Sequence, residues 1–181
     1  MKKNSFSNKD QERSQKKVFY LLYEDAVKFT FRYTNIGSNT EHYVYKGFGQ
    51  LFREWKHINL ADLHLIKALL KIILIKICIE SEMKQEELND ALKEYAFFYN
   101  YPSEKLQLNS LSAKQIIDIV KSIPFPLRLL YNLSVIDGYT EKEIASILHI
   151  QPELIQRNIH LARQCLIHAY SYNTELERKR V

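Results

Sequence analysis

Helical spacing of apolar residues, with little to interrupt it, is the feature that most constrains the fold of this chain. Only four Gly and four Pro occur among its 181 residues. Because glycine and proline supply most hairpin turns and phosphate-binding loops, their scarcity leaves little material for either. No segment shows the alternation of apolar and polar residues that is typical of a half-buried strand. The sequence therefore predicts an all-α fold.

Four helices are predicted in the first part of the chain, where apolar residues recur at steps of three and four. Ser38 and Glu41 have the spacing of a capping box ahead of the second helix. Gly47 and Gly49 lie inside that helix, where we expect them to permit close helix packing. The third helix is apolar on nearly every side, which is typical of a buried central helix. The expected ranges are about 18–33, 41–55, 60–80 and 88–99.

Four more helices are predicted in the second part. Ser112 is the expected N-cap of the first, and Pro124 ends it. Thr140 and Glu143 have capping-box spacing at the start of a short third helix. Pro152 stands at the first position of a long last helix, where its missing N–H does no harm. The expected ranges are about 113–123, 127–136, 140–148 and 152–170.

The polar, unperiodic stretch from Tyr101 to Leu111 is the expected linker between two helical domains. Proline at position 102 ends the preceding helix, because it disfavours a helical conformation in the residue before it. The expected organisation is a disordered basic tail over 1–17, a first helical domain over 18–100, the linker over 101–111, a second helical domain over 112–172 and a tail over 173–181.

The formal net charge of +5 suggests a polyanionic partner, but its distribution weakens that inference. Residues 1–17 carry +4 and the tail from Asn173 carries +1, so the charges between them sum to zero. A protein that held nucleic acid by phosphate neutralisation alone would carry a basic stripe on its folded body. If the free chain binds DNA, we therefore expect its affinity to be low and another component to hold it there.

The segment from Thr140 through a tight turn to Tyr170 has the spacing of a helix-turn-helix. The face of the last helix that is predicted to point inward comprises Ile155, Ile159, Ala162 and Leu166. The stripe that is predicted to point outward comprises Glu153, Gln156, Arg157, His160, Arg163 and Gln164. Gln can read adenine edges, and Arg can read guanine edges. The stripe thus suits major-groove reading, although any surface helix is polar on its outer face.

The run from Tyr131 to Arg163, with its Asp137-Gly138-Tyr139 corner, resembles the fourth conserved region of bacterial RNA polymerase sigma factors of the extracytoplasmic-function group. The preceding stretch 123–128 is similar to the Leu-Pro…Arg lead-in of that group. In the first half, Leu22-Tyr23 with Ala26 resembles the opening of the group's second region. Residues 40–52 resemble its polymerase-binding helix, and residues 71–80 resemble its promoter-melting helix.

The resemblance implies a sigma factor that directs core RNA polymerase to promoter DNA and opens it. Core polymerase and promoter DNA are the implied partners, and an anti-sigma factor is a further candidate. The residues implied to face bases of the minus-thirty-five element are Gln156, Arg157 and His160. Those implied to hold phosphates are Thr140, Lys142 and Arg163. Those implied to bind the polymerase are Glu41, Tyr45, Phe48 and Phe52.

Departures from the family pattern leave an alternative open. His42 and Tyr45 stand where the polymerase-binding helix usually carries Asp and Gln, and Lys46 replaces a common acid. The alternative is a helix-turn-helix transcriptional regulator that has lost core polymerase binding and reads a palindrome as a dimer. A third hypothesis is a pure interaction protein whose last helix docks on another helix.

An enzyme is not expected, since the sequence has no glycine-rich phosphate loop, no paired-His metal motif and no Ser or Cys nucleophile in a recognisable setting. Cys165 and His168 share a helix face but are too few for a zinc site, so we expect neither a metal nor a cofactor. The chain shows no signal peptide and no run of about 20 apolar residues that could span a membrane. The cytoplasm is the expected compartment, which two cysteines without a disulfide framework also favour.

Overall fold

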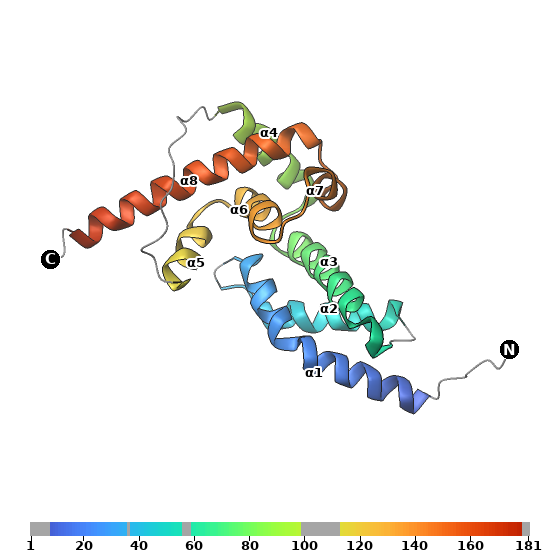
Figure 1. The fold of residues 1–181 in the computed structure, drawn as a ribbon. Coiled ribbons are helices and arrows are strands. Elements are labelled where there is room, and N and C mark those ends of the chain that lie inside the picture. The colour runs from blue at the N-terminus through green and yellow to red at the C-terminus, as the bar shows by residue number, and fades with distance from the viewer. Residues whose placement is uncertain (1–7, 36, 56–58, 99–112, 179–181) are drawn as a thin grey trace. The chain divides into compact units, whose positions relative to one another are not determined.

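The fold is all-α, as predicted. The computed structural model describes residues 8–35, 37–55, 59–98 and 113–178, and every regular element in these ranges is a helix (Figure 1). The chain forms two compact units that divide between Glu82 and Met83. Over the same ranges, no helix combines the length and the apolar composition that crossing a membrane demands.

The first unit is a bundle of three helices, each in contact with the other two. They are α1 (Asn8–Arg32), α2 (Thr40–Glu54) and α3 (Leu63–Glu82), and the 3-10 turn η1 (Leu60–Asp62) precedes α3. The third helix is the central one, as its composition predicted, because most of its apolar side chains are buried. Apolar residues that are buried on α1 and α2 repeat at helical spacing and complete the core of this unit.

Two helices extend further than the sequence pattern suggested. Residues 8–17, which we expected to be disordered, form the first turns of α1. They are rich in Lys, Gln, Glu and Arg, which are strong helix formers. Asp10 in the first turn also stabilises the helix, because its negative charge lies near the positive end of the helix dipole. In the expected C-terminal tail, the last helix likewise continues to Arg178. Apolar periodicity marks only the part of a helix that carries an apolar stripe, so it does not reveal helical turns whose sequence lacks one.

The second helix starts with a different cap from the predicted one. The capping residue is Asn39, whose Oδ1 accepts a hydrogen bond from the backbone N–H of His42 at 3.0 Å, and not Ser38. Asparagine is at least as good an N-cap as serine, because its side-chain oxygen reaches the same unpaired N–H groups. The predicted capping box of Ser38 and Glu41 is therefore wrong, because the N-cap lies one residue later, at Asn39.

The two glycines of α2 differ in their surroundings. A Cβ atom added to Gly47 would lie 2.6 Å from Cδ2 of Leu74, so this glycine permits the close approach of α3 that we predicted. Gly49 is exposed, and an added Cβ would meet no atom within 4 Å. Close packing therefore explains only Gly47, and the sequence pattern alone did not distinguish the two.

The second unit contains five α-helices in the described residues. They are α4 (Gln85–Phe98), α5 (Ala113–Ser122), α6 (Phe125–Tyr131), α7 (Glu141–Leu148) and α8 (Pro152–Arg178). The predicted helix over 127–136 ends as a π-helical turn, η2 (Asn132–Ile136), in which the N–H of Asp137 donates to the carbonyl of Asn132 at 2.8 Å. The left-handed Gly138 that follows, with φ of 75°, then turns the chain toward α7.

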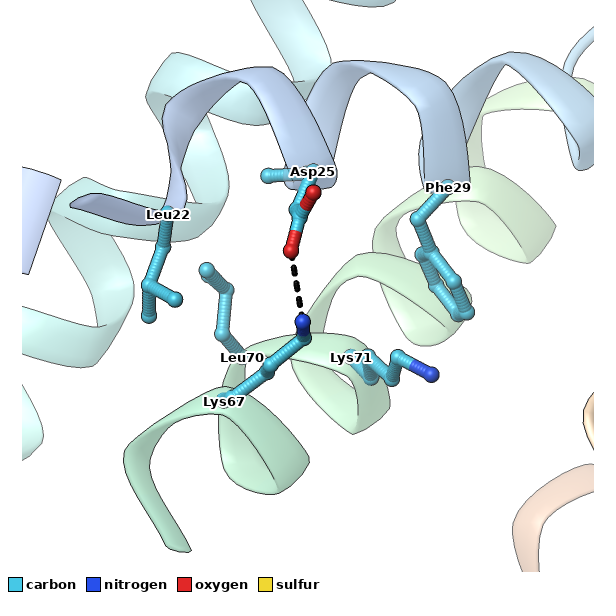
Figure 2. A pocket seen from close by; sticks show the side chains of 7 residues that line it. Leu22, Asp25, Phe29, Lys67, Leu70 and Lys71 are labelled. Atoms are coloured by element: carbon cyan, nitrogen blue, oxygen red, sulfur yellow. Dashed lines mark hydrogen bonds and ion pairs between the residues drawn. The ribbon is translucent and has the colours of Figure 1, made fainter. Parts of the chain in front are cut away.

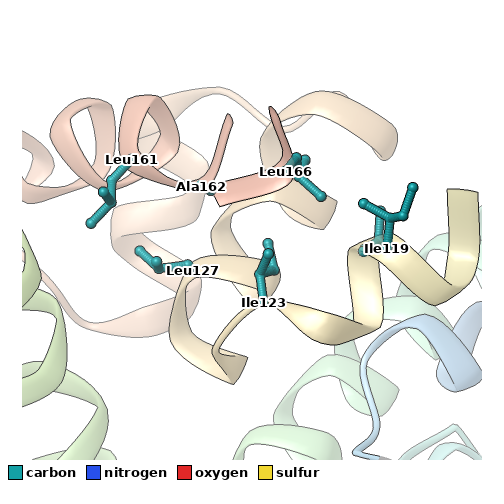
Figure 3. Close-up of a cluster of buried hydrophobic side chains, with 7 residues drawn as sticks. Ile119, Ile123, Leu127, Leu161, Ala162 and Leu166 are labelled. Atoms are coloured by element: carbon teal, nitrogen blue, oxygen red, sulfur yellow. The ribbon is translucent and has the colours of Figure 1, made fainter. Parts of the chain in front are cut away.

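The core of the second unit forms where α5 and α6 meet one side of α8. Figure 3 shows buried side chains of this cluster pointing toward one another from the three helices and from Ile123, which lies between α5 and α6. Arg128 ties α5 to α6, because its buried guanidinium donates to the carbonyl of Lys121 at 3.1 Å. The cluster comprises Ile119, Val120, Ile123, Leu127, Leu161, Ala162 and Leu166.

Helix α4 belongs to the second compact unit, whereas the sequence pattern led us to group it with the first domain. It packs against α8 and α6, and its Leu88 and Leu92 side chains are fully buried. An amphipathic pattern reveals that a helix has a buried face but not which partner covers it, which explains the difference. The expected linker over 101–111 and the expected cap at Ser112 lie outside the described residues.

The two glycines of α2 allow a matched test of this packing. We expect Gly49→Ala to raise the free energy of unfolding by about 0.5–1 kcal/mol, since alanine is the better helix former and has room there. Gly47→Ala gains the same propensity but must displace the buried Leu74, and overpacking costs about 1–3 kcal/mol. Urea denaturation should therefore find Gly47→Ala the less stable variant by at least about 1 kcal/mol. Equal stabilities would contradict close α2–α3 packing.

Candidate nucleic-acid interface

Helices α7 and α8 and the turn between them form the predicted helix-turn-helix. The turn comprises residues 149–151, and α8 begins at Pro152 as expected. His149 adopts the left-handed conformation with φ of 52°, which is uncommon for a residue other than glycine. The N–H of Ile150 donates to the carbonyl of Ala145 at 3.3 Å, and that of Leu154 donates to the carbonyl of Gln151 at 3.1 Å. The turn is thus closed by backbone hydrogen bonds on both sides.

The predicted capping box starts α7. Thr140 Oγ1 accepts from the backbone N–H of Glu143 at 3.3 Å, while Glu143 Oε2 accepts from the Thr140 N–H and hydroxyl, each at 2.8 Å. These hydrogen bonds, the backbone one first, lower the pKa of Glu143 below its ordinary value of 4.5. Thr140 and Lys142 are both exposed beside this end of α7. The Glu143 carboxylate is the anion that the N–H groups and the helix dipole favour at this end of α7.

The inward face of α8 is as predicted. Its four apolar residues are between 0% and 7% exposed. The base-facing candidates lie on the opposite side and are exposed, as the same helical geometry requires. The inward residues are Ile155, Ile159, Ala162 and Leu166. The exposed residues are Glu153, Gln156, Arg157, His160 and Arg163.

Gln164 departs from the predicted outward stripe, because it is only 4% exposed. It follows exposed Arg157 by seven residues, so both side chains leave α8 in nearly the same direction. Their different exposure depends on what surrounds each part of the helix, which a helical wheel does not include. The exposed stripe therefore consists mainly of the N-terminal half of α8.

Arg163 lies at the border between α8 and α6. Its positive charge acts to lower the pKa of the half-buried Tyr131, against the larger effect of burial, which raises it. Arg163 therefore interacts electrostatically with the Tyr131 hydroxyl of α6 while its own side chain remains exposed. This position at the edge of the exposed stripe suits a phosphate contact better than a base contact.

Sequence reasoning missed the role of Asn158, which lies on a third face of α8. The side chain is fully buried, and its Nδ2 donates to the carbonyls of Leu92 at 2.9 Å and Leu154 at 2.8 Å. The available signal was that Asn158 lies between Leu154 and Leu161 at helical spacing, where a polar residue on an apolar strip needs a partner. This face of α8 packs against α4.

The four polymerase-binding candidates lie on α2 of the first unit, but they differ in exposure. Glu41 is exposed, Tyr45 is 54% exposed, Phe52 is half-buried and Phe48 is only 2% exposed. A partner cannot touch Phe48 without disturbing the core. The ring of Phe48 instead packs 4.8 Å from that of Phe19 and supports the exposed aromatic surface above it.

The aromatic surface of the first unit is centred on Tyr45. Its ring centroid lies 6.0 Å from that of Phe19 and 5.7 Å from that of Tyr23. A hydrogen bond with Tyr45, followed by burial and the negative charge of Glu41, raises the pKa of Tyr23 to about 12. Glu41, Tyr23 and Tyr45 therefore form one continuous polar–aromatic patch over α1 and α2.

A shallow pocket between α1 and α3 offers no chemistry of its own. Figure 2 shows Lys67 paired with Asp25 across its mouth, while Lys71 and Phe29 line it on one side. Lys71 Nζ lies 5.0 Å from the centre of the Phe29 ring, and the side chain of Lys67 lowers the pKa of Asp25. The remaining lining is mainly aliphatic. Across the described part of the chain, no group of three or more His, Cys, Asp or Glu residues is arranged to hold a metal.

The capping box should make α7 sensitive to acid. Because the pKa of Glu143 is lowered on folding, its contribution to stability is present above 4.5 and disappears as the pH falls through the lowered value. Thr140→Ala removes the side-chain half of the box and should cost about 1 kcal/mol at neutral pH. The difference in the free energy of unfolding between the wild type and Thr140→Ala should narrow below pH 4.5. Urea denaturation at a series of pH values measures this difference. Ser146→Ala, an exposed site on the same helix, is the control, and a Thr140→Ala variant as stable as this control would refute the box.

Comparison with protein families identifies the type of this helix-turn-helix. Residues 113–166 match the family model of sigma-70, region 4. The match extends from α5 into α8 and includes the capped α7 and the exposed stripe. No curated protein and no solved structure gives a significant match to the chain. The matched segment, which runs from α5 into α8, therefore supports a sigma-70 region 4 domain, a DNA-binding domain of transcription factors.

Proposed function

We propose that this protein is a sigma factor of the extracytoplasmic-function type, which directs core RNA polymerase to its promoters and initiates transcription in the bacterial cytoplasm. The observation that carries the proposal is the sigma-70 region 4 match over residues 113–166, on a helix-turn-helix whose last helix has an exposed polar stripe. Core polymerase and promoter DNA are the partners that this role requires. An anti-sigma factor is a further candidate partner.

In this proposal, the N-terminal half of α8 enters the major groove of the minus-thirty-five element. Gln156, Arg157 and His160 are exposed on one side of the helix, and their amide, guanidinium and imidazole groups suit base edges. Thr140 and Lys142 at the start of α7 are proposed to lie beside the phosphate backbone, where Lys142 supplies a positive charge, and Arg163 adds a charge at the other edge. Phosphate contacts set the register, and base contacts supply the specificity.

The first unit is proposed to hold the polymerase and to open the minus-ten element. The patch formed by Glu41, Tyr23 and Tyr45 offers a carboxylate and two aromatic rings, which is the chemistry of a protein interface. Phe48 and Phe52 are assigned the supporting role that their burial allows. A factor carried to DNA by the polymerase needs little positive charge of its own. This agrees with the formal charges of the chain between its two basic ends, which sum to zero.

The regulator without polymerase binding is the second candidate function. It is favoured by His42, Tyr45 and Lys46, because all three are exposed on the helix that would face the polymerase. Such a regulator would bind its sites as an isolated chain, whereas a sigma factor would need the polymerase.

Run-off transcription with purified core polymerase tests the proposed function. We expect the chain to co-purify with core enzyme and to support specific initiation on its own promoters, which a genome-wide binding profile of the tagged protein would identify. Tight sequence-specific DNA binding by the chain alone, without co-purification of core enzyme, would instead establish the regulator. Absence of both polymerase binding and DNA binding would refute both candidates.

Arg157→Ala should relax the reading of one base pair. Removing a guanidinium that contacts a base edge costs about 1–3 kcal/mol of discrimination at that base. The measurement compares run-off yields on promoters that differ at single positions of the upstream element. Lys93→Ala, which removes an exposed cation of α4, is the matched control and should leave the preference at every position unchanged. An unchanged base preference in Arg157→Ala would contradict the role assigned to Arg157.

A further inference from the structure

Helix α4 precedes the segment that matches the sigma family but belongs to the same compact unit. The match begins at residue 113, whereas α4 covers Gln85–Phe98 and the second unit begins at Met83. In Figure 1, α4 lies against α8 near the end that adjoins α7, and the contacts with α8 are more extensive than those with α6. The side chains of Leu88 and Leu92 are completely buried. The helix is therefore an integral part of the unit that contains the helix-turn-helix.

Two hydrogen bonds tie α4 to the helices on both sides of the helix-turn-helix turn. Gln85 Nε2 donates to the carbonyl of Leu148, the last residue of α7, at 2.7 Å. Asn158 Nδ2, in the second turn of α8, donates to the carbonyl of Leu92 at 2.9 Å. The first bond holds the C-terminal end of α7, and the second holds α8. One helix is thus bonded to the elements on both sides of the turn at residues 149–151.

Each of the two amides is oriented by a second contact. Gln85 Nε2 also donates to Asn89 Oδ1, one helical turn later, at 3.1 Å. Asn158 Nδ2 also donates to the carbonyl of Leu154 at 2.8 Å. Both hydrogens of each amide therefore have an acceptor, and each side chain is held in one direction.

Stability alone does not account for Asn158. Its Oδ1 is buried and has no hydrogen-bond partner among the described residues, which costs folding free energy. A leucine at this position would bury apolar surface beside Leu154 and Leu161 and would leave no such orphan atom. The amide instead fixes the register between α4 and α8, because a hydrogen bond is directional whereas apolar contacts alone would let the two helices slide.

We propose that α4 is a brace for the helix-turn-helix, with Gln85 and Asn158 as positioning residues that set the angle and the rotation of α8 relative to α7. The brace determines how Gln156, Arg157 and His160 are presented to DNA, and in this respect it rests on the function proposed above. The DNA-reading module accordingly begins with α4 rather than at the start of the family match.

Hydrogen exchange in the full chain tests the brace without DNA or polymerase. Gln85→Glu removes the donor and puts a negative charge beside the C-terminal carbonyls of α7, an unfavourable end for an anion. The amides of His149 and Ile150 should then exchange about five- to tenfold faster. Gln85→Lys keeps a donor that suits those carbonyls and should exchange like the wild type. Glu87→Gln, on the exposed side of α4, is the control.

Asn158→Leu separates positioning from stability. We expect a melting temperature equal to or above that of the wild type, because the orphan oxygen is removed, together with faster exchange of the α4 amides. On DNA, discrimination against single-base changes in the upstream element should fall about three- to tenfold in both Gln85→Glu and Asn158→Leu. Gln85→Lys should discriminate between these bases as well as the wild type does.

Exchange rates at residues 149–150 that are the same in Gln85→Glu, Gln85→Lys and wild type would overturn the brace, whether or not the chain acts as a sigma factor. If exchange responds as expected but the wild type neither binds promoters nor supports initiation, the brace stands as a structural device and the proposed function fails. If exchange responds but base discrimination is unchanged in both variants, α4 does not position the reading helix.

Discussion

Burial of one apolar face of α8 is the interaction on which the rest of the second unit depends. Ile155, Ile159, Ala162 and Leu166 are all buried, so the rotation of the helix about its own axis is set. A helix that turns 100° per residue must then expose the residues opposite them. Gln156, Arg157 and His160 consequently face away from the core. The polar stripe is thus a geometric consequence of hydrophobic burial.

Apolar burial alone leaves the helix free to slide or tilt, and the second unit limits both motions with polar contacts. The capping box of Thr140 and Glu143 fixes where α7 begins, and His149 in its left-handed conformation fixes where it turns toward α8. The hydrogen bonds of Gln85 and Asn158 then connect α4 to both helices. These contacts are directional, which makes them suited to holding the exposed stripe of α8 in a single orientation.

The first unit follows a different physical plan. Its helices approach closely at Gly47, where Leu74 fills the space that a side chain would take. Buried aromatic rings such as Phe48 support an exposed surface around Tyr45. The formal charges between the two basic ends of the chain sum to zero, so this part of the chain carries no excess charge that would attract a polyanion over a long range.

The sequence by itself determined the all-α class, the helix-turn-helix, the cap at Thr140 and the inward face of α8, since each depends on residues close together in the chain. Tertiary structure alone decided that α4 packs with the second unit, that Gln164 is buried although Arg157 in the same direction is exposed, and that Asn158 is an anchor. It also decided that Gly47 lies against Leu74 while Gly49 does not. The physical reason is the same throughout. Local spacing specifies a helix and its apolar side, whereas the identity of the covering partner depends on contacts between residues that are distant in sequence.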